Sequence, residues 1–272
     1  MAWLRGAARR PEAPETGQGE RVYAIGDIHG RFDLLGVLLR AIQEDSNRRL
    51  PNATRLVFLG DAIDRGPDSA AVLRALHRAS SFEGVTVLRG NHEAALLDCA
   101  RAEREAIRAW PAYGGDATLA SFGIAPCGAE EAPLDFARRL IEGVGRPLLD
   151  WLRTCPTSTR SGDYFFCHAG VRPRVPLDRQ SDEDLLWIRE DFTASTAYHG
   201  AVIVHGHSEC DAIELLPNRI NLDTGAYRTG VLSAIGLEGA KQWTISTGSR
   251  RGDGDIRVGA QQKGAGGFPP AP

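Results

Sequence analysis

The sequence has little of what marks secreted, membrane-spanning or nucleic-acid-binding proteins. Its five cysteines form an odd set without a C-x-x-C pair, which argues against a disulfide framework or a zinc ribbon and favours a reducing compartment. No run approaches the roughly 20 apolar residues of a membrane span, and the first residues lack the apolar core of a signal peptide. A net charge of −3 gives no basic field for nucleic acid. We expect a cytoplasmic protein without membrane or nucleic-acid partners.

The 272 residues divide into a long central part and two polar ends. The length and the 42% hydrophobic content suit one large domain with its own core. Residues 1–20 and 248–272 combine glycine, proline and charged residues with little apolar surface, so we expect both to be disordered tails. The expected single domain covers residues 21–247.

The first half of this domain alternates short β-branched runs with helical periodicity. The expected strands are 21–25, 55–59 and 85–88, and the expected helices are 32–42, 69–77 and 93–103. This rhythm predicts an α/β fold with parallel strands. Residues 105–155 contain a Gly114-Gly115 loop and an amphipathic helix near 134–152, which we interpret as an insertion around a site.

The second half differs, because its strand-like runs are joined by short connections. These runs are 164–167, 201–204, 219–222, 231–235 and 243–246. Short connections are typical of antiparallel neighbours. We therefore expect a largely antiparallel sheet in this half of the domain.

Each of the first three expected strands ends in a short polar motif bounded by glycine. The motifs are Gly26-Asp27-Ile28-His29-Gly30, Gly60-Asp61-Ala62-Ile63-Asp64-Arg65-Gly66 and Gly90-Asn91-His92-Glu93. Ligands of open α/β sheets bind in the crevice at the carboxyl ends of the strands, so all three motifs should face one crevice. Two later runs end in His168 and in His205-Gly206-His207. Imidazole and carboxylate groups at one site suit Mn, Fe or Zn.

Each motif alone has a simpler interpretation. A Gly-Asp pair after a strand is typical of a turn, and Asn91 and Glu93 suit the start of a helix. A single histidine at a strand end is more often a satisfied polar group than a metal ligand. Five such features in order, each directly after an apolar run, favour a metal site.

Taken together, the three motifs and the two later histidines resemble the signature of the phosphoprotein phosphatase superfamily, the calcineurin-like metallophosphoesterases. The resemblance runs from about Arg21 to Ser246. Three further stretches look like the bacterial and phage lambda-type serine/threonine protein phosphatases: Trp110 to Leu119, Leu186 to Glu190 and Asn221 to Ala226. The resemblance implies an α/β metallophosphoesterase fold, a central β-sandwich of two mixed sheets flanked by helices, with the active site at the C-terminal ends of the strands.

The resemblance also implies a role for each residue at a matching position. The expected metal ligands are Asp27, His29, Asp61 as the bridge between two ions, Asn91, His168 and His207. The expected catalytic pair is His92 as general acid with Asp64 as its partner, and the expected phosphate-binding residues are Arg65, Asn91 and Arg189. The cofactors would be two divalent or trivalent metal ions, with Mn favoured and Fe or Zn as alternatives.

His205 leaves one assignment open, because it lies two residues before His207. On a strand both side chains share a face, so either could reach a metal. The Gly206-His207-Ser208 sequence stands where the family has its second isolated histidine, and we favour His207.

Elementary chemistry supports this set of residue types. Hydrolysis of a phosphomonoester in water is extremely slow, and two metal ions about 3.5–4 Å apart can activate a bridging hydroxide and bind phosphate oxygens. A histidine beside a carboxylate can protonate the leaving group, and a guanidinium matches phosphate with two parallel hydrogen bonds. The chain has no evident cysteine-based phosphatase loop, so direct attack without a covalent intermediate is expected.

Three functions are compatible with these residues. The first is a serine/threonine protein phosphatase, acting on phosphorylated proteins or peptides and also on small phosphoesters. The alternative is a symmetrical bis(5'-nucleosyl)-tetraphosphatase, a sister group that commonly has a non-acidic residue in place of Asp64 and Asp in place of Glu93. The third is a non-catalytic binding module, which the survival of every motif position disfavours. Asp64 and Glu93 favour the protein phosphatase.

Overall fold

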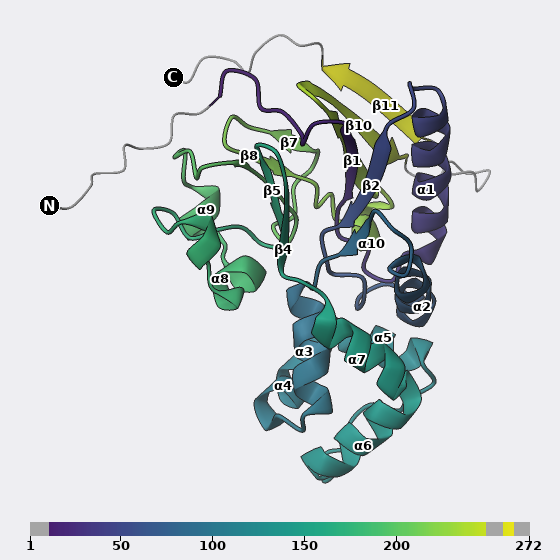
Figure 1. Cartoon of the computed structure of the whole chain (residues 1–272). Coiled ribbons are helices and arrows are strands. Elements are labelled where there is room, and N and C mark those ends of the chain that lie inside the picture. The colour runs from purple at the N-terminus through teal and green to yellow at the C-terminus, as the bar shows by residue number, and fades with distance from the viewer. Residues whose placement is uncertain (1–10, 249–257, 264–272) are drawn as a thin grey trace, which may run out of the picture.

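The computed structural model describes residues 11–248 and 258–263 (Figure 1). Residues 1–10, 249–257 and 264–272 of the two expected tails lie outside the described residues. Residues 15–17, inside the expected N-terminal tail, are hydrogen-bonded to the domain: Asp163 N donates to Glu15 O over 2.8 Å, and Thr16 N donates to Gly239 O over 3.2 Å. The limits of a single domain at residues 21 and 247 stay a prediction.

The first sheet begins with three parallel strands, as the sequence predicts. They are β1 (Glu20–Ile25), β2 (Ala53–Phe58) and β3 (Val85–Val87). The connections contain α1 (Phe32–Asn47) and α2 (Ser69–Ala79). Helix α1 buries one apolar face formed by Leu34, Leu35, Leu38 and Ile42, which is the periodicity that predicts it.

Three antiparallel strands extend this sheet on the other side of β1. They are β9 (Ser233–Glu238), β10 (Lys241–Thr247) and β11 (Val258–Lys263), in the order β11-β10-β9-β1-β2-β3. Strand β11 falls inside the segment that composition predicts to be a disordered tail. Without β11, strand β10 would be the edge of the sheet and would offer a row of unpaired backbone N–H and C=O groups that can pair with almost any sequence. Composition carries no signal of this pairing.

The second sheet has the order β4-β5-β6-β8-β7. Its strands are β4 (Ser158–Ser161), β5 (Tyr164–Cys167), β6 (Val202–His205), β7 (Glu214–Leu215) and β8 (Arg219–Asn221). The expectation of a largely antiparallel sheet is wrong here, because β5, β6 and β8 run parallel. Residues 168–201 between β5 and β6 form a long connection with α8 (Asp182–Trp187) and α9 (Glu190–Thr193), which is what parallel neighbours need.

The two mixed sheets pack face to face, and helices flank them. The apolar residues between the sheets come from both: Val22, Ala24 and Val57 from the first, and Tyr164, Phe166, Val202, Val204 and Ile220 from the second. The predicted fold class, an α/β β-sandwich of two mixed sheets, is confirmed. None of the described helices is long and apolar enough to cross a membrane.

A group of helices lies between β3 and β4 (Figure 1). It contains α3 (Asn91–Ala100), α4 (Arg104–Ala109), the 3-10 helix η1 (Trp110–Tyr113), α5 (Gly115–Ser121), α6 (Pro133–Val144) and α7 (Arg146–Thr154). The single helix expected near 134–152 is two helices. Gly145 separates them with a φ of 94°, a left-handed value that favours glycine, and Pro147 stands in the first turn of α7.

Candidate metal centre

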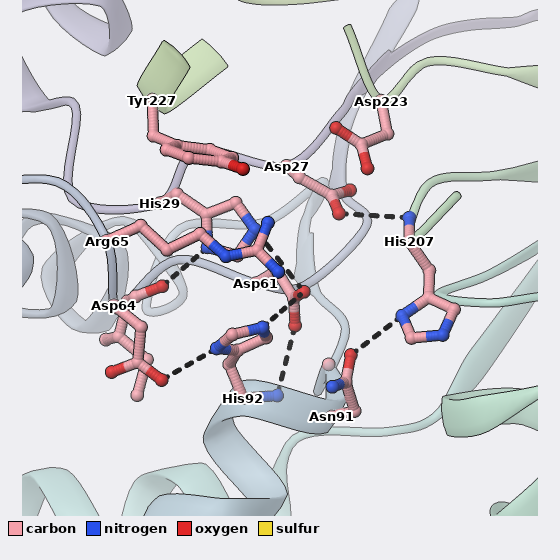
Figure 2. A network of polar contacts seen from close by, with 12 residues as sticks. Asp27, His29, Asp61, Asp64, Arg65, Asn91, His92, His207, Asp223 and Tyr227 are labelled. Atoms are coloured by element: carbon pink, nitrogen blue, oxygen red, sulfur yellow. Dashed lines mark hydrogen bonds and ion pairs between the residues drawn. The ribbon is translucent and has the colours of Figure 1, made fainter. Parts of the chain in front are cut away.

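Five loops bring the predicted site residues together at the C-terminal ends of β1, β2, β3, β5 and β6. Figure 2 shows several of these side chains around one common space. Three of them have a left-handed backbone: φ is 45° at His29, 49° at Asp61 and 64° at His207. Residues other than glycine rarely adopt such values, and those that do cluster at functional sites. The sharp turns at the strand ends aim the side chains inward.

Asp61 occupies the middle of the site. Its Oδ2 lies 3.7 Å from His29 Nε2 and 3.6 Å from His92 Nε2, and its Oδ1 lies 3.3 Å from His168 Nε2. Two buried groups of potential ligands share this carboxylate: His29, Asp61 and His92 in one, and Asp61, His168 and His207 in the other. Within each group the potential ligand atoms lie within 4.8 Å of one another. Asp61 is thus the one carboxylate that could contact a cation in each of the two groups.

The protein holds two of the imidazole rings from behind. His29 Nδ1 lies 2.8 Å from the carbonyl oxygen of Ile63, and His168 Nδ1 lies 3.0 Å from that of Leu59. Each carbonyl accepts the Nδ1 proton and leaves Nε2 facing Asp61, the arrangement commonly seen behind metal-bound histidines. Burial lowers the pKa of His29 to about 3 and that of His207 to about 2, so these rings are neutral.

Asn91 connects the two histidines of the second group. Its Oδ1 lies 2.8 Å from His168 Nε2 and 2.9 Å from His207 Nδ1. Asp61 outweighs burial and raises the pKa of His168, so Nε2 can carry a proton in this contact. If a cation took the place of that proton, the Nε2 lone pair and the amide oxygen would both face it. Lone pairs that converge in a buried space are stabilised by a cation.

Asp27 adds a second carboxylate, with Asp223 beside it as a third acidic group. Oδ2 of Asp27 accepts a hydrogen bond from the backbone N–H of His207 (2.9 Å), whereas Oδ1 has no partner among the described residues. Burial, Asp223 and Asp61 raise the pKa of Asp27 well above its usual range. Gly206 is required beside it, because a Cβ there would lie 1.9 Å from Asp27 Oδ1.

These donors fit two metal ions. Neutral imidazoles, carboxylates that repel one another and an unpartnered carboxylate oxygen surround one buried space, and such N and O ligands suit Mn, Fe or Zn. Distances alone place His92 in the first group, whereas Asp27 belongs to neither group. The assignment of Asp27, His29, Asp61, Asn91, His168 and His207 as ligands stays a prediction, and the unpartnered Oδ1 supports Asp27.

His92 and Asp64 are held by a network that sequence reasoning missed. His92 Nδ1 lies 2.7 Å from Asp64 Oδ2, which also accepts a hydrogen bond from Trp110 Nε1 (2.9 Å). Thr118 Oγ1 donates to the other oxygen, Oδ1, over 2.6 Å. All four residues are buried. Residues of the 105–155 insertion therefore orient Asp64, the partner of the expected general acid. In the sequence, the only sign of these residues is the family resemblance of the stretch from Trp110 to Leu119.

The Trp110→Phe variant should lower kcat on an alkyl phosphate about tenfold with little change in KM, because it removes one hydrogen bond to a buried charged group. Steady-state kinetics will measure this. The matched control is Trp151→Phe, since Trp151 of α7 packs on His77 of α2 and has no hydrogen bond to Asp64. Equal losses in both variants would mean that Trp110 acts only through packing.

Glu93 braces the loop that carries Asp61. Its Oε2 accepts hydrogen bonds from the backbone N–H groups of Asp61 and Gly90 (both 2.9 Å), and its Oε1 accepts from that of Ala62 (2.8 Å). Burial is the main cause that raises the pKa of Glu93, to about 6. Glu93 thus acts on the protein backbone and not on a substrate.

Arg65 and Arg189 stand at the edge of the site. The Arg65 guanidinium lies 4.7 Å from the centre of the Tyr227 ring, and Figure 2 shows it beside His29 and Asp61. Arg189 is exposed, and its Nη1 lies 3.5 Å from the carbonyl oxygen of His207. Both positions are compatible with the phosphate-binding roles that the resemblance implies.

His205 lies outside both groups of potential ligands. Its ring is fully buried, its Nδ1 lies 3.0 Å from the carbonyl oxygen of Gly206, and it packs edge-on against Phe192 at 5.0 Å between ring centres. The preference for His207 over His205 is in line with this placement. The structure adds Asp223 and Tyr227 to the site. Both come after β8: Asp223 lies within the Asn221 to Ala226 stretch, and Tyr227 follows it directly.

The class of protein that this fold and site define is a metal-dependent hydrolase of phosphate esters. Residues 20–231 match the family of calcineurin-like phosphoesterases. The chain belongs to this family.

Individual relatives differ in their names. A symmetrical bis(5'-nucleosyl)-tetraphosphatase from Dechloromonas aromatica (strain RCB) is 36% identical over 157 residues, 58% of this chain and 46% of that protein. Serine/threonine-protein phosphatase 1 of Salmonella typhimurium is 37% identical over 102 residues, 38% of this chain and 42% of that protein. The matches span about half the length of these relatives, 46% and 42%. A solved structure provisionally named a diadenosine tetraphosphatase shares the fold, with a TM-score of 0.56, 22% identity, and coverage of 93% of this chain and 100% of that one.

Proposed function

We propose that this protein hydrolyses dinucleoside tetraphosphates symmetrically, at a site that holds two metal ions around Asp61. The observation that carries the proposal is the set of relatives, 31% to 36% identical over more than half of this chain, that are named symmetrical bis(5'-nucleosyl)-tetraphosphatases. The sequence argument against this function rested on Asp64 and Glu93. Glu93 braces backbone N–H groups and Asp64 holds His92, so neither residue selects the substrate directly.

In the proposed hydrolysis, the metal ions and the protein side chains have separate roles. Two bound metal ions supply positive charge for phosphate oxygens and lower the pKa of water. Arg65 and Arg189 bind and orient the phosphate at the edge of the site. Burial lowers the pKa of His92, but Asp61 and Asp64 outweigh it and raise that pKa, which favours the protonated ring. Nδ1–H of His92 points to Asp64, and Nε2 is free to protonate a leaving oxygen.

Serine/threonine protein phosphatase activity is the second candidate, and the His92–Asp64 pair favours it. The alkoxide that leaves phosphoserine is strongly basic and needs a proton, whereas the ADP that leaves a dinucleoside tetraphosphate departs readily as an anion. A well-held general acid is therefore of most use with monoesters. The Salmonella typhimurium relative bears this second name.

A substrate panel separates the two functions. Metal-depleted protein is reconstituted with Mn, Fe or Zn and assayed on diadenosine tetraphosphate and on a phosphothreonine peptide. We expect kcat/KM to be at least about tenfold higher on diadenosine tetraphosphate with the best ion, with ADP as the nucleotide product. A higher kcat/KM on the peptide would overturn the proposal in favour of the second candidate.

A further inference from the structure

Two arginines and one tyrosine converge on a single carboxylate at the edge of the metal centre. Arg65 Nη1 donates to Glu209 Oε1 over 3.2 Å, and Arg228 Nη2 donates to Oε2 over 2.9 Å. The hydroxyl of Tyr227 also donates to Oε1, over 2.8 Å. The three donors come from two places far apart in the sequence, the loop after β2 and the helix α10 (Ala226–Thr229).

The cluster of Arg65, Glu209, Tyr227 and Arg228 contacts the expected metal ligand His29 at one end and solvent at the other. The ring of Tyr227 packs edge-on against His29, with 5.5 Å between ring centres, and the Arg65 guanidinium lies over the same ring, 4.7 Å from its centre. Side-chain exposure rises from 25% at Arg65 to 58% at Arg228. The cluster therefore forms a polar path from the metal centre to solvent.

The charges of the cluster favour an anion. Two guanidinium groups face one carboxylate, which leaves one positive charge in excess. The guanidinium groups of Arg65 and Arg228 both donate to Glu209, and Arg228 also interacts with the hydroxyl of Tyr227. Each guanidinium has five N–H donors, so both keep donors for a phosphate oxygen.

Gly225 lies next to the Glu209–Arg228 ion pair and has no side chain to contact it. A Cβ at this position would lie 3.0 Å from Glu209 Oε2 and 3.4 Å from Arg228 Nη2, and the backbone there has a φ of 62°. Both the close approach and the left-handed backbone favour glycine. Gly225 therefore fits its own backbone conformation and lies next to the Glu209–Arg228 pair.

We infer that Tyr227 and Arg228 bind a second phosphoryl group, the neighbour of the one at the metal centre, with Arg65 between the two phosphoryl groups, and that Glu209 holds these three side chains in place until the phosphate replaces it. This inference rests on the proposed function, because only a substrate with linked phosphates has a second phosphoryl group to bind. The ligand class is a nucleoside diphosphate unit. Glu209 is a positioning residue, and Arg228 is the new binding residue.

The test compares AMP with ADP, which differ by one phosphoryl group. Isothermal titration of protein kept in excess Mn should show ADP binding more tightly than AMP. The Arg228→Gln variant should weaken ADP binding about tenfold, as expected for one charge-assisted hydrogen bond, and AMP binding less than about twofold. The control is Arg138→Gln, which removes an exposed guanidinium paired with Asp135 on α6 and should leave both affinities unchanged.

Glu209→Gln distinguishes binding from a structural role. It removes the competing charge at constant size, so ADP affinity should rise by a few fold, whereas a purely structural Glu209 would give a loss. Equal effects of Arg228→Gln on AMP and ADP, or none, would overturn the inference. Turnover of diadenosine tetraphosphate by the unaltered protein is measured separately, so a failure of the proposed function is seen on its own.

Discussion

The Asp61→Asn variant is expected to lose turnover by about 10³-fold or more, since the charge of metal ions at a phosphoryl centre contributes several kcal/mol. Asp61 is the one carboxylate common to both groups of potential ligands. Burial opposes its ionisation, yet His168 and His92 hold its pKa well below the usual range. The site is therefore arranged around an ionised Asp61, and a neutral amide cannot hold two cations together.

The substitution is well suited to a test because it preserves the local hydrogen bond. Asp61 Oδ1 accepts the backbone N–H of His92 over 3.1 Å, and an Asn Oδ1 can accept it too. Turnover and metal content per chain are measured together with the melting temperature. Asp98→Asn is the control, since Asp98 forms an exposed pair with Arg101 on α3. Full activity in Asp61→Asn with two bound ions would contradict the bridging role.

The His92→Asn variant should lose turnover by about 10²- to 10⁴-fold on a phosphoserine peptide, which is the range of general acid catalysis. The loss on p-nitrophenyl phosphate should be less than about tenfold, because that leaving group needs no proton. This split follows from the 2.7 Å contact with Asp64, which leaves Nε2 of His92 as the proton donor.

Metal content decides between two roles of His92. The resemblance makes it the general acid, whereas distances alone place it with His29 and Asp61 as a potential ligand. A general acid leaves both ions bound after replacement by Asn. Loss of one ion, with equal losses on both substrates, would show instead that His92 is a ligand.

The convergence of the expected ligands could be predicted from the sequence, because each of them follows an apolar strand. Carboxyl ends of neighbouring parallel strands meet at one edge of a sheet, so Asp27, Asp61 and Asn91 had to come close. The glycines at these ends signalled close approach, and Gly206 beside Asp27 is an instance. His168 and His207 follow from the same rule, since β5 and β6 are also parallel neighbours.

Contacts made by side chains from distant segments could not be predicted in this way. Trp110 and Thr118 reach Asp64 through the packing of α3 to α5, and Glu209 reaches Arg65 across 144 residues. Neither contact has a periodic signal. The prediction of an antiparallel sheet for β5, β6 and β8 overlooks the length of residues 168–201, which is enough for a crossover between parallel strands.

The sequence contains a signal for the break between α6 and α7 at Gly145, but the apolar periodicity points the other way. A glycine followed two residues later by Pro147 is a typical end and restart of helices, yet the apolar periodicity continues across it. Leu140, Leu148 and Leu152 are all buried, so both helices present one apolar face to the same core. Because the apolar residues of the two helices keep one helical spacing along the sequence, the pattern predicts a single helix.

The most direct test of the account is anomalous diffraction from crystals of the protein reconstituted with Mn. We expect two peaks on either side of the Asp61 carboxylate, one in contact with His29 and the other with His168 and His207. A single peak, or no peak bonded to Asp61, would contradict the shared centre from which the proposed hydrolysis follows.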